Sequence, residues 1–206
     1  MMSDSELAPT VPSDPDERTF AEQFTEYRPR LKRMLQFRID PRLSSRTDLS
    51  DVLQESYIDA FRRLEHFQSK PGMSMYVWLR QITLQRLIDI HRLHLKADKR
   101  NIQNEVRLQQ QAASSAVIAA HLVDVMISPS QVAIRQEMVS QTESALDQLD
   151  EIDREVLALR HFEELTNGEV AQVLDISEAA ASNRYVRALT RLRKDLEKIP
   201  DFFDGE

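Results

Sequence analysis

Hydrophobic side chains along most of this chain recur at steps of three and four residues, which places them on one face of an α-helix. The clearest stripe lies near the N-terminus and comprises Phe20, Phe24, Tyr27, Leu31 and Leu35. Similar patterns over 48–67, 73–96 and 129–199 predict further helices, and no run alternates between apolar and polar residues as a half-buried strand does. The sequence therefore predicts an all-α protein.

Three segments without this periodicity divide the chain. Residues 1–18 combine three prolines with several acids and predict a disordered tail. Residues 101–128 include the low-complexity run QQQAASSA and at most a short helix, so we interpret them as a flexible linker. Residues 200–206 are expected to form a second exposed tail. Two small helical domains, at 19–100 and 129–199, are therefore expected.

The stretch Leu165–Lys194 predicts two helices joined by a tight turn, which is the plan of a helix-turn-helix. Thr166 and Glu169 have the spacing of a capping box, Asp175 tolerates the left-handed turn conformation, and Ser177 suits the cap of the second helix. We expect the second helix to turn a small set of apolar residues inward: Ala181, Tyr185, Ala188, Leu189 and Leu192. The alternative is a helical hairpin with a solvated basic face.

Because the N-terminal half of a recognition helix enters the major groove, the two ends of this helix should make different contacts with DNA. The residues expected near base edges are Glu178, Ala179, Ser182, Asn183 and Arg184. Arg187 and Arg191 lie further along and are expected at the phosphate backbone.

The formal net charge of −7 is unusual for a DNA-binding protein, but it is unevenly distributed. Residues 19–100 carry 16 basic and 10 acidic side chains, a net charge of +6. Residues 101–206 carry 10 basic and 19 acidic side chains, a net charge of −9, yet five bases and no acid fall within 184–194. The predicted surface for a polyanion is therefore local, and non-specific DNA binding should be weak.

Signatures of enzymes are scarce in this sequence. The chain has no cysteine and only three glycines, which excludes thiol chemistry and glycine-rich nucleotide loops. His91 and His94 are the only pair with metal-like spacing, and no further ligands complete a site. Glu163 and Glu164 are adjacent and make a poor acid/base pair. We expect no catalytic residue, cofactor or metal, and the absence of a signal peptide or membrane span predicts a cytoplasmic protein.

Two further surfaces carry candidate binding residues. The helix expected over 48–67, which Thr47 or Asp48 can cap, presents acidic and amide side chains that suit a basic partner helix, although such strips are often only solvated: Asp51, Gln54, Glu55 and Asp59. On the helix expected over 73–96, Tyr76, Arg80, Gln81 and Arg86 are expected to point outward, an arrangement that suits single-stranded nucleic acid. Periodicity places Trp78 in the core more readily than against a base.

Three blocks of this chain, in this order, resemble the bacterial RNA polymerase sigma factors of the extracytoplasmic-function (ECF) type. DLSDVLQESYIDAFRRLEHF is similar to the helix that grips the polymerase clamp, and MYVWLRQITLQRLIDIHR to the promoter-melting segment. The block LDQLDEIDREVLALRHFEELTNGEVAQVLDISEAAASNRYVRALTRLR is similar to the region that reads the upstream promoter element. The two domains would then be a region 2-like helical bundle and a region 4-like helix-turn-helix domain.

The resemblance implies partners and roles for these surfaces. Core RNA polymerase would bind Asp48, Asp51, Gln54 and Glu55, and the unpaired strand of the downstream element would meet a second set: Tyr76, Trp78, Arg80, Gln81 and Arg86. Promoter DNA is the second implied partner, an anti-sigma factor is a candidate third, and no membrane is involved. Asp175 stands where family members often have Gly, and Ala180 and Ala181 where they often have Thr-Val, so inherited promoter specificity does not follow.

Two other classes remain compatible with the residues alone. A helix-turn-helix regulator of the response-regulator type would use the same recognition helix, but not the acidic strip or the Trp78 helix. A helical scaffold that binds only protein would suit the acidic total charge.

Overall fold

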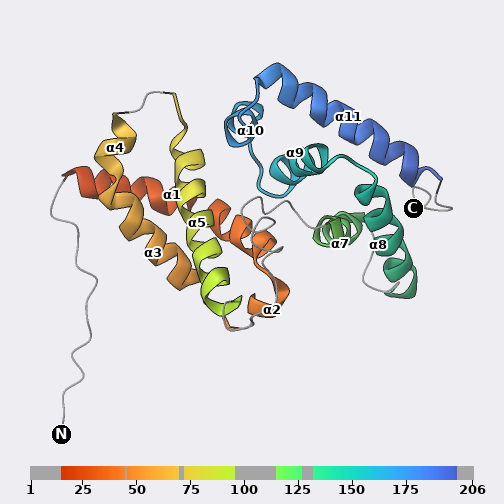
Figure 1. The fold of residues 1–206 in the computed structure, drawn as a ribbon, viewed down its shortest axis with the longest axis horizontal. Helices are drawn as coiled ribbons and strands as arrows, with labels where there is room; N and C mark the ends of the chain where they lie inside the picture. The colour runs from red at the N-terminus through yellow and green to blue at the C-terminus, as the bar shows by residue number, and fades with distance from the viewer. Residues whose placement is uncertain (1–14, 45, 70–71, 96–114, 127–131, 199–206) are drawn as a thin grey trace, which may run out of the picture.

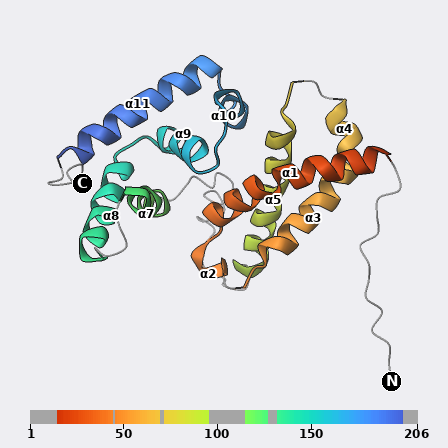
Figure 2. The same ribbon diagram turned by 180° about the vertical axis from the view of Figure 1, so that it is seen from behind.

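The computed structural model describes residues 15–44, 46–69, 72–95, 115–126 and 132–198. Within these residues every regular element is helical, as the periodicity predicts. The helices form two halves that lie side by side, α1 to α5 and α7 to α11 (Figure 1). Seen from behind, the halves meet through α1 and α5 on one side and the α9–α10 region on the other (Figure 2). None of the described helices is both long and apolar enough to cross a membrane.

The first half is built on three longer helices: α1 (Pro15–Arg38), α3 (Leu49–Arg62) and α5 (Met75–Leu95). Two short helices, α2 (Pro41–Ser44) and α4 (Leu64–Gln68), complete it. The predicted stripe on α1 is correct, since Phe20, Phe24, Leu31 and Leu35 are buried and Tyr27 packs against the same cluster. The packing of α1 on α3 and α5 gives this half its core.

The second half contains α7 (Ser115–Met126), α8 (Val132–Asp147), α9 (Glu151–His161), α10 (Asn167–Leu174) and α11 (Glu178–Leu196). Its own core lies between α7, α8, α9 and α11 and includes Ile118, Val123, Leu146, Leu157 and Leu192. Helix α7 packs along α8. A hydrophobic helix that pairs with a neighbour in this way is part of the domain.

The boundaries expected from the sequence differ from the structure in three places. Helix α1 begins at Pro15, inside the expected tail. Proline is expected to start, kink or break a helix, and Pro29 lies inside α1. The helix expected over 48–67 is divided at Arg63 into α3 and α4. The interpretation of 101–128 as a linker is wrong for 115–126, because α7 buries Ile118, Ala119 and Val123. The predicted tails at 1–14 and 200–206, and the start of a helix at Pro129, lie outside the described residues.

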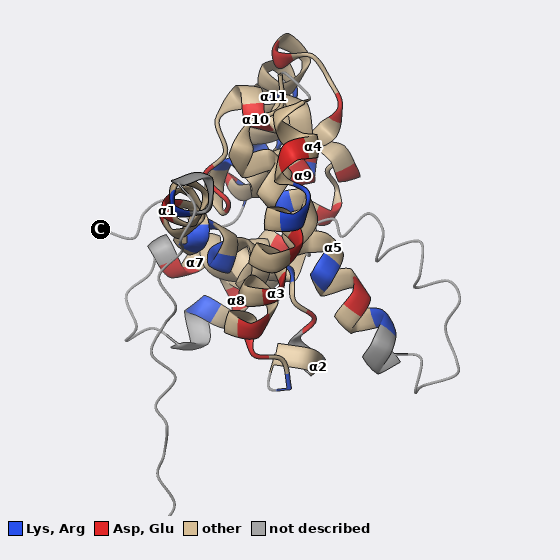
Figure 3. Cartoon of the chain, turned by 90° about the vertical axis from the view of Figure 1, so that its left-hand side faces the viewer, with Lys and Arg blue, Asp and Glu red and all other residues tan. Residues whose placement is uncertain are grey.

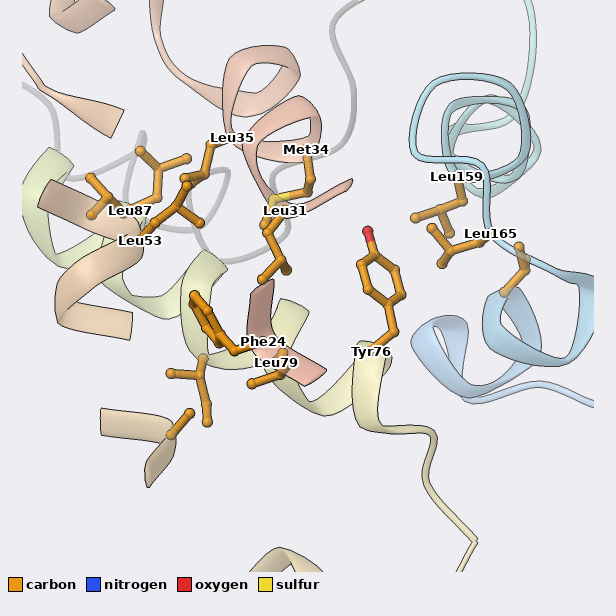
Figure 4. Close-up of a cluster of buried hydrophobic side chains, with 14 of the residues drawn as sticks. Phe24, Leu31, Met34, Leu35, Leu53, Tyr76, Leu79, Leu87, Leu159 and Leu165 are labelled. Carbon is orange, nitrogen blue, oxygen red and sulfur yellow. The ribbon is translucent and has the colours of Figure 1, made fainter. Parts of the chain in front are cut away.

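The hydrophobic core of the first half continues across the boundary between the halves. It joins Leu31 and Met34 of α1 to Leu159 and Leu165 of the second half. Figure 4 shows the ring of Tyr76, at the start of α5, standing between these two pairs. The core of the first half therefore extends into the second half, which also has a core of its own.

Candidate functional site

The helix-turn-helix forms through the local signals that the sequence predicts. The Thr166 hydroxyl accepts a hydrogen bond from the amide of Glu169 at 3.2 Å, and the Glu169 carboxylate accepts one from the amide of Thr166 at 2.8 Å. Asp175 ends α10 in the left-handed conformation, with φ of 52° and ψ of 47°. Ser177 then caps α11 by accepting from the amide of Ala180 at 3.1 Å. The capping box, the turn residue and the second cap are confirmed.

Helix α11 buries one face and exposes the other. Ala181, Ala188 and Leu192 are buried and Tyr185 is partly buried, as expected. The expectation for Leu189 is wrong, because 37% of this residue is exposed. Four of the five residues expected near base edges are exposed, namely Glu178, Ala179, Ser182 and Asn183. The N-terminal half of α11 is therefore accessible to a groove.

The arginines of α11 contact acidic residues at the start of α9. Arg187 donates to the Asp153 carboxylate through Nε at 2.7 Å and through Nη2 at 2.6 Å, and Arg184 donates through Nη1 at 3.0 Å. Arg191 lies 3.5 Å from Asp150. Asp153 is fully buried; burial alone would raise its pKa, but the hydrogen bonds from Arg187 and Arg184 hold it below the usual range. Sequence reasoning missed Asp153, which orients two predicted DNA contacts.

The predicted polymerase-binding strip lies on the open side of α3. The side chains of Asp48, Asp51, Gln54 and Glu55 are all exposed. Asp48 caps the helix, because its Oδ1 accepts from the amide of Ser50 at 2.7 Å. These acidic and amide groups follow one another along the surface of α3, so the structure brings the strip together as predicted, although its role in binding stays a prediction.

Helix α5 carries the five residues expected to hold the unpaired strand, and the structure separates them. Gln81 is exposed and Arg86 is partly exposed, with its guanidinium 2.5 Å from Asp59 and 3.8 Å from Glu55. Trp78 is partly buried and its ring stacks on Phe67 at a centroid distance of 4.4 Å. Charged segments of both signs alternate along the lower part of α5 (Figure 3).

Tyr76 and Arg80 do not point outward in this structure, which corrects the expectation. Tyr76 is 1% exposed and Arg80 is 3% exposed, because both face the second half of the molecule. Burial raises the pKa of the Tyr76 hydroxyl far above its usual value, and the nearby Glu163 raises it further. The Tyr76 hydroxyl has no hydrogen-bond partner among the described residues, which costs about 1 to 3 kcal/mol.

Glu163, which the sequence offered only as a poor acid/base candidate, is the partner of Arg80. Its Oε2 accepts from Arg80 Nε at 2.5 Å, and its Oε1 accepts from Arg38 Nε at 2.7 Å. Burial alone would raise the pKa of Glu163, but Arg80 and Arg38 together hold it below the usual range. No local sequence signal marks this residue, since its partners lie 83 and 125 positions away.

Nothing in the described part of the chain gathers three or more metal-ligating side chains. His91 is buried, and the side chain of His94 lies outside the described residues. A small open hollow at the C-terminal end of α11 is lined by polar and charged side chains, among them Arg191, Lys194 and Lys198. The basic side chains of this hollow suit binding of a polyanion.

Both halves of the chain match models of known protein families. Residues 23–98 match the model of sigma-70 region 2, and residues 145–194 match that of sigma-70 region 4. The chain is 27% identical to the ECF RNA polymerase sigma-E factor of Haemophilus influenzae over 158 residues, which cover 77% of this chain and 79% of that protein. It is also 27% identical to the RNA polymerase sigma-H factor of Pseudomonas aeruginosa, over 74% of this chain and 75% of the relative.

A solved structure gives a weaker likeness. The sigma factor RpoE of Bartonella quintana, crystallised with the anti-sigma factor NepR, has a TM-score of 0.48 and 17% sequence identity to this chain. The superposition covers 87% of this chain and 98% of that chain.

Proposed function

This chain belongs to the sigma-70 family of RNA polymerase sigma factors, of the ECF type, and on that premise we propose how its two halves divide the work of transcription initiation. The protein binds core RNA polymerase and promoter DNA and directs initiation at promoters. We propose that it does so without covalent chemistry of its own. Because both partners are in the bacterial cytoplasm, we expect it there.

The observation that carries the proposal is the recognition helix within a fully capped helix-turn-helix. The exposed N-terminal face of α11 presents Glu178, Ser182 and Asn183, whose polar groups can read base edges of the upstream element. Arg184 borders this face and is assigned with it to base edges, whereas Arg187 and Arg191 lie further toward the C-terminal end and suit the phosphate backbone. Asp153 limits the motion of two of these arginines, which supports a fixed register on DNA.

We assign the polymerase contact to α3. Its exposed strip, Asp48, Asp51, Gln54 and Glu55, suits a basic helical partner, and charge-assisted contacts of this kind typically contribute about 2 kcal/mol or more when they are desolvated. The match of residues 23–98 to region 2 argues against a lone helix-turn-helix regulator of the response-regulator type and against a protein-only scaffold. An anti-sigma factor stays a predicted partner, which affinity purification from the native cell would test.

A run-off transcription assay tests the proposed function. Core polymerase with this protein should produce defined transcripts from genomic fragments, and core polymerase alone should not. Asp51→Lys combined with Glu55→Lys should remove transcripts and co-purification with core enzyme while leaving the helical circular dichroism signal intact. Glu22→Lys combined with Glu26→Lys, on the exposed surface of α1, gives the same charge change as a control. Equal loss in both double variants would contradict the assignment to α3.

A further inference from the structure

Four arginines of the first half line the boundary with the second half. They come from α1 and from the first turns of α5, and we call them the basic face: Arg30, Arg33, Arg38 and Arg80. Only Arg80 belongs to the residues assigned above to promoter DNA. Arg38 and Arg80 are 8% and 3% exposed, an unusual degree of burial for arginine, which is seldom fully buried unless it is paired.

Each member of the basic face contacts a carboxylate of the second half. These carboxylates lie on α9, on the α9–α10 turn and at the start of α10, and we call them the acidic edge: Glu155, Glu163, Glu164 and Glu169. Glu163 binds both Arg38 and Arg80, and Arg38 also binds Glu155. Arg30 contacts Glu169 at 3.2 Å, and Arg33 contacts Glu164. Opposite charges thus match one another across the boundary.

The turn that leads into α5 is held by the same part of the second half. Gln172 of α10 donates from Nε2 to the carbonyl of Gly72 at 3.0 Å, and its Oε1 accepts from the amide of Ser74 at 3.0 Å. The guanidinium of Arg30 lies 3.6 Å from the centre of the Tyr76 ring. The acidic edge and Gln172 therefore fix the start of α5. They cover the ring of Tyr76 and the arginines of the basic face.

The chemistry of the basic face fits a second ligand as well as it fits the acidic edge. A guanidinium group matches the geometry of phosphate as it matches that of carboxylate. An aromatic ring beside arginines is the combination that takes up single-stranded nucleic acid, because bases stack on the ring while the arginines hold phosphates. Tyr76 lies among these arginines, under Arg30 and beside the Glu163 that binds Arg80.

We propose that the basic face is a binding surface for single-stranded nucleic acid and that this surface extends onto α1 through Arg30, Arg33 and Arg38. In the free protein the acidic edge covers the surface, and its carboxylates occupy the positions that phosphates take in the complex. The inference rests on the proposed function, since it makes the melted promoter strand the ligand. Separation of the two halves would exchange carboxylates for phosphates and leave every arginine paired. Free protein would then bind single strands weakly, and an opened protein would bind them well.

Glu163→Gln provides the first test, because it removes the central charge of the acidic edge with little change in shape. The purified full chain is titrated into fluorescein-labelled oligo(dT), and binding is followed by fluorescence anisotropy at several salt concentrations. Glu151→Gln, an exposed residue of α9 outside the boundary, changes the net charge equally and serves as the control. Glu163→Gln should bind roughly tenfold more tightly than the wild type and the control, because the binding-competent fraction rises.

The salt dependence reports how many arginines are released. Each phosphate contact to a single strand contributes about 0.7 to the slope of log affinity against log salt, so the four arginines of the uncovered face should together contribute up to about 3. A gain in affinity whose size and salt slope are both unaffected by Arg30→Ala would overturn the proposal, because the gain would not come from the arginines. Arg30→Ala in the Glu163→Gln background should reduce the slope again by about 0.7.

A crosslink provides a test that does not depend on Glu163. Because the chain has no cysteine, Met73→Cys and Gln172→Cys introduce the only two thiols, on either side of the boundary. Residue 73 lies between the two backbone groups that Gln172 contacts, and Met73 is exposed. After reaction with a short bis-maleimide, the closed protein should bind oligo(dT) no better than the wild type, even with Glu163→Gln present.

The outcomes separate this inference from the proposed function. If the wild type supports run-off transcription but Glu163→Gln binds oligo(dT) no better than Glu151→Gln, the acidic edge covers no binding surface and the inference is wrong. If the crosslinked protein binds as tightly as uncrosslinked Glu163→Gln, the inference is also wrong. Failure of the wild type to support transcription with core polymerase would instead contradict the proposed function.

Discussion

The two surfaces of this sigma factor that we assign to promoter DNA differ in how accessible they are. On α11 the residues nearest base edges, Glu178, Ser182 and Asn183, face solvent. On α5 the residues assigned to the unpaired strand include Tyr76 and Arg80, which are buried against the other half. Duplex DNA is present before initiation, whereas an unpaired strand exists only after melting. A surface for duplex can therefore stay open, and a surface for single strands can stay covered until it is needed.

The largest expected effect is on the free energy of unfolding, when a buried arginine of α5 is compared with a partly exposed one. Arg80→Ala leaves Glu163 buried with one partner fewer, and breaking such a pair typically costs about 3 to 5 kcal/mol. Arg86→Ala removes a partly exposed pair with Asp59 and should cost less than about 1 kcal/mol. Urea unfolding of both variants measures the difference. Equal losses of unfolding free energy in the two variants would show that Arg80 does not form the buried pair with Glu163.

The same two variants also test the role of α5 in promoter melting. Both should still bind core polymerase, since the residues of the exposed strip on α3 stay in place and Arg86→Ala removes only a 3.8 Å contact to Glu55. Promoter thymines in the resulting complexes should be less reactive to permanganate than with the wild type, because fewer groups hold the unpaired strand. If permanganate reactivity stays at the wild-type level with both variants, Arg80 and Arg86 do not belong to the site for the unpaired strand.

A somewhat smaller effect is expected at Trp78, where packing and base contact make different predictions. Its ring stacks on Phe67 and lies edge-on to Phe20. Trp78→Ala should lower the free energy of unfolding by about 2 to 3 kcal/mol, less than for a fully buried ring, and Trp78→Phe should cost less than about 1.5 kcal/mol. Thermal unfolding measures both. If Trp78→Ala unfolds like the wild type yet abolishes permanganate reactivity, Trp78 contacts a base instead of the core.

On α11 we compare an arginine assigned to base edges, Arg184, with one assigned to the phosphate backbone, Arg191. Arg184→Ala should cost roughly 1 to 3 kcal/mol on the preferred upstream element and relax discrimination at one position. Arg191→Ala should weaken binding to all sequences alike and flatten the salt dependence by about one unit of slope. Matched and scrambled elements at two salt concentrations separate these results. An unchanged sequence preference in Arg184→Ala would place the helix in another register or groove.

The smallest expected effect is a dependence of stability on pH. The pKa values of Glu163 and Asp153 are lower in the folded protein than in the unfolded chain, so the unfolded chain takes up protons at a higher pH. Their contribution to stability is therefore complete above the ordinary carboxylate range and is lost as the pH falls through the lowered pKa values. Each group adds at most about 1.4 kcal/mol per pH unit. Urea unfolding across acidic pH should show a shallower dependence for Glu163→Gln than for the wild type, and identical curves would contradict the pairing.

The sequence by itself determined the elements whose causes are local. The capping box of Thr166 and Glu169, the left-handed turn at Asp175 and the cap at Ser177 each involve neighbours a few residues apart, so their spacing is visible in the chain. The exposed strip on α3 was predictable for the same reason, because helical periodicity separates its polar face from Val52 and Leu53. The division into two helical halves followed from these patterns together.

Only the tertiary structure decided which polar side chains are buried between the halves. Helical periodicity places Tyr76 and Arg80 away from the core of their own half, and that surface is covered because α9 and α10 pack on it. Likewise, the ambiguous stretch at 115–126 became a packed helix only because α8 offers an apolar partner. Glu163 and Asp153 carry no local signal, since the free energy that keeps a carboxylate charged and buried comes from arginines distant in sequence.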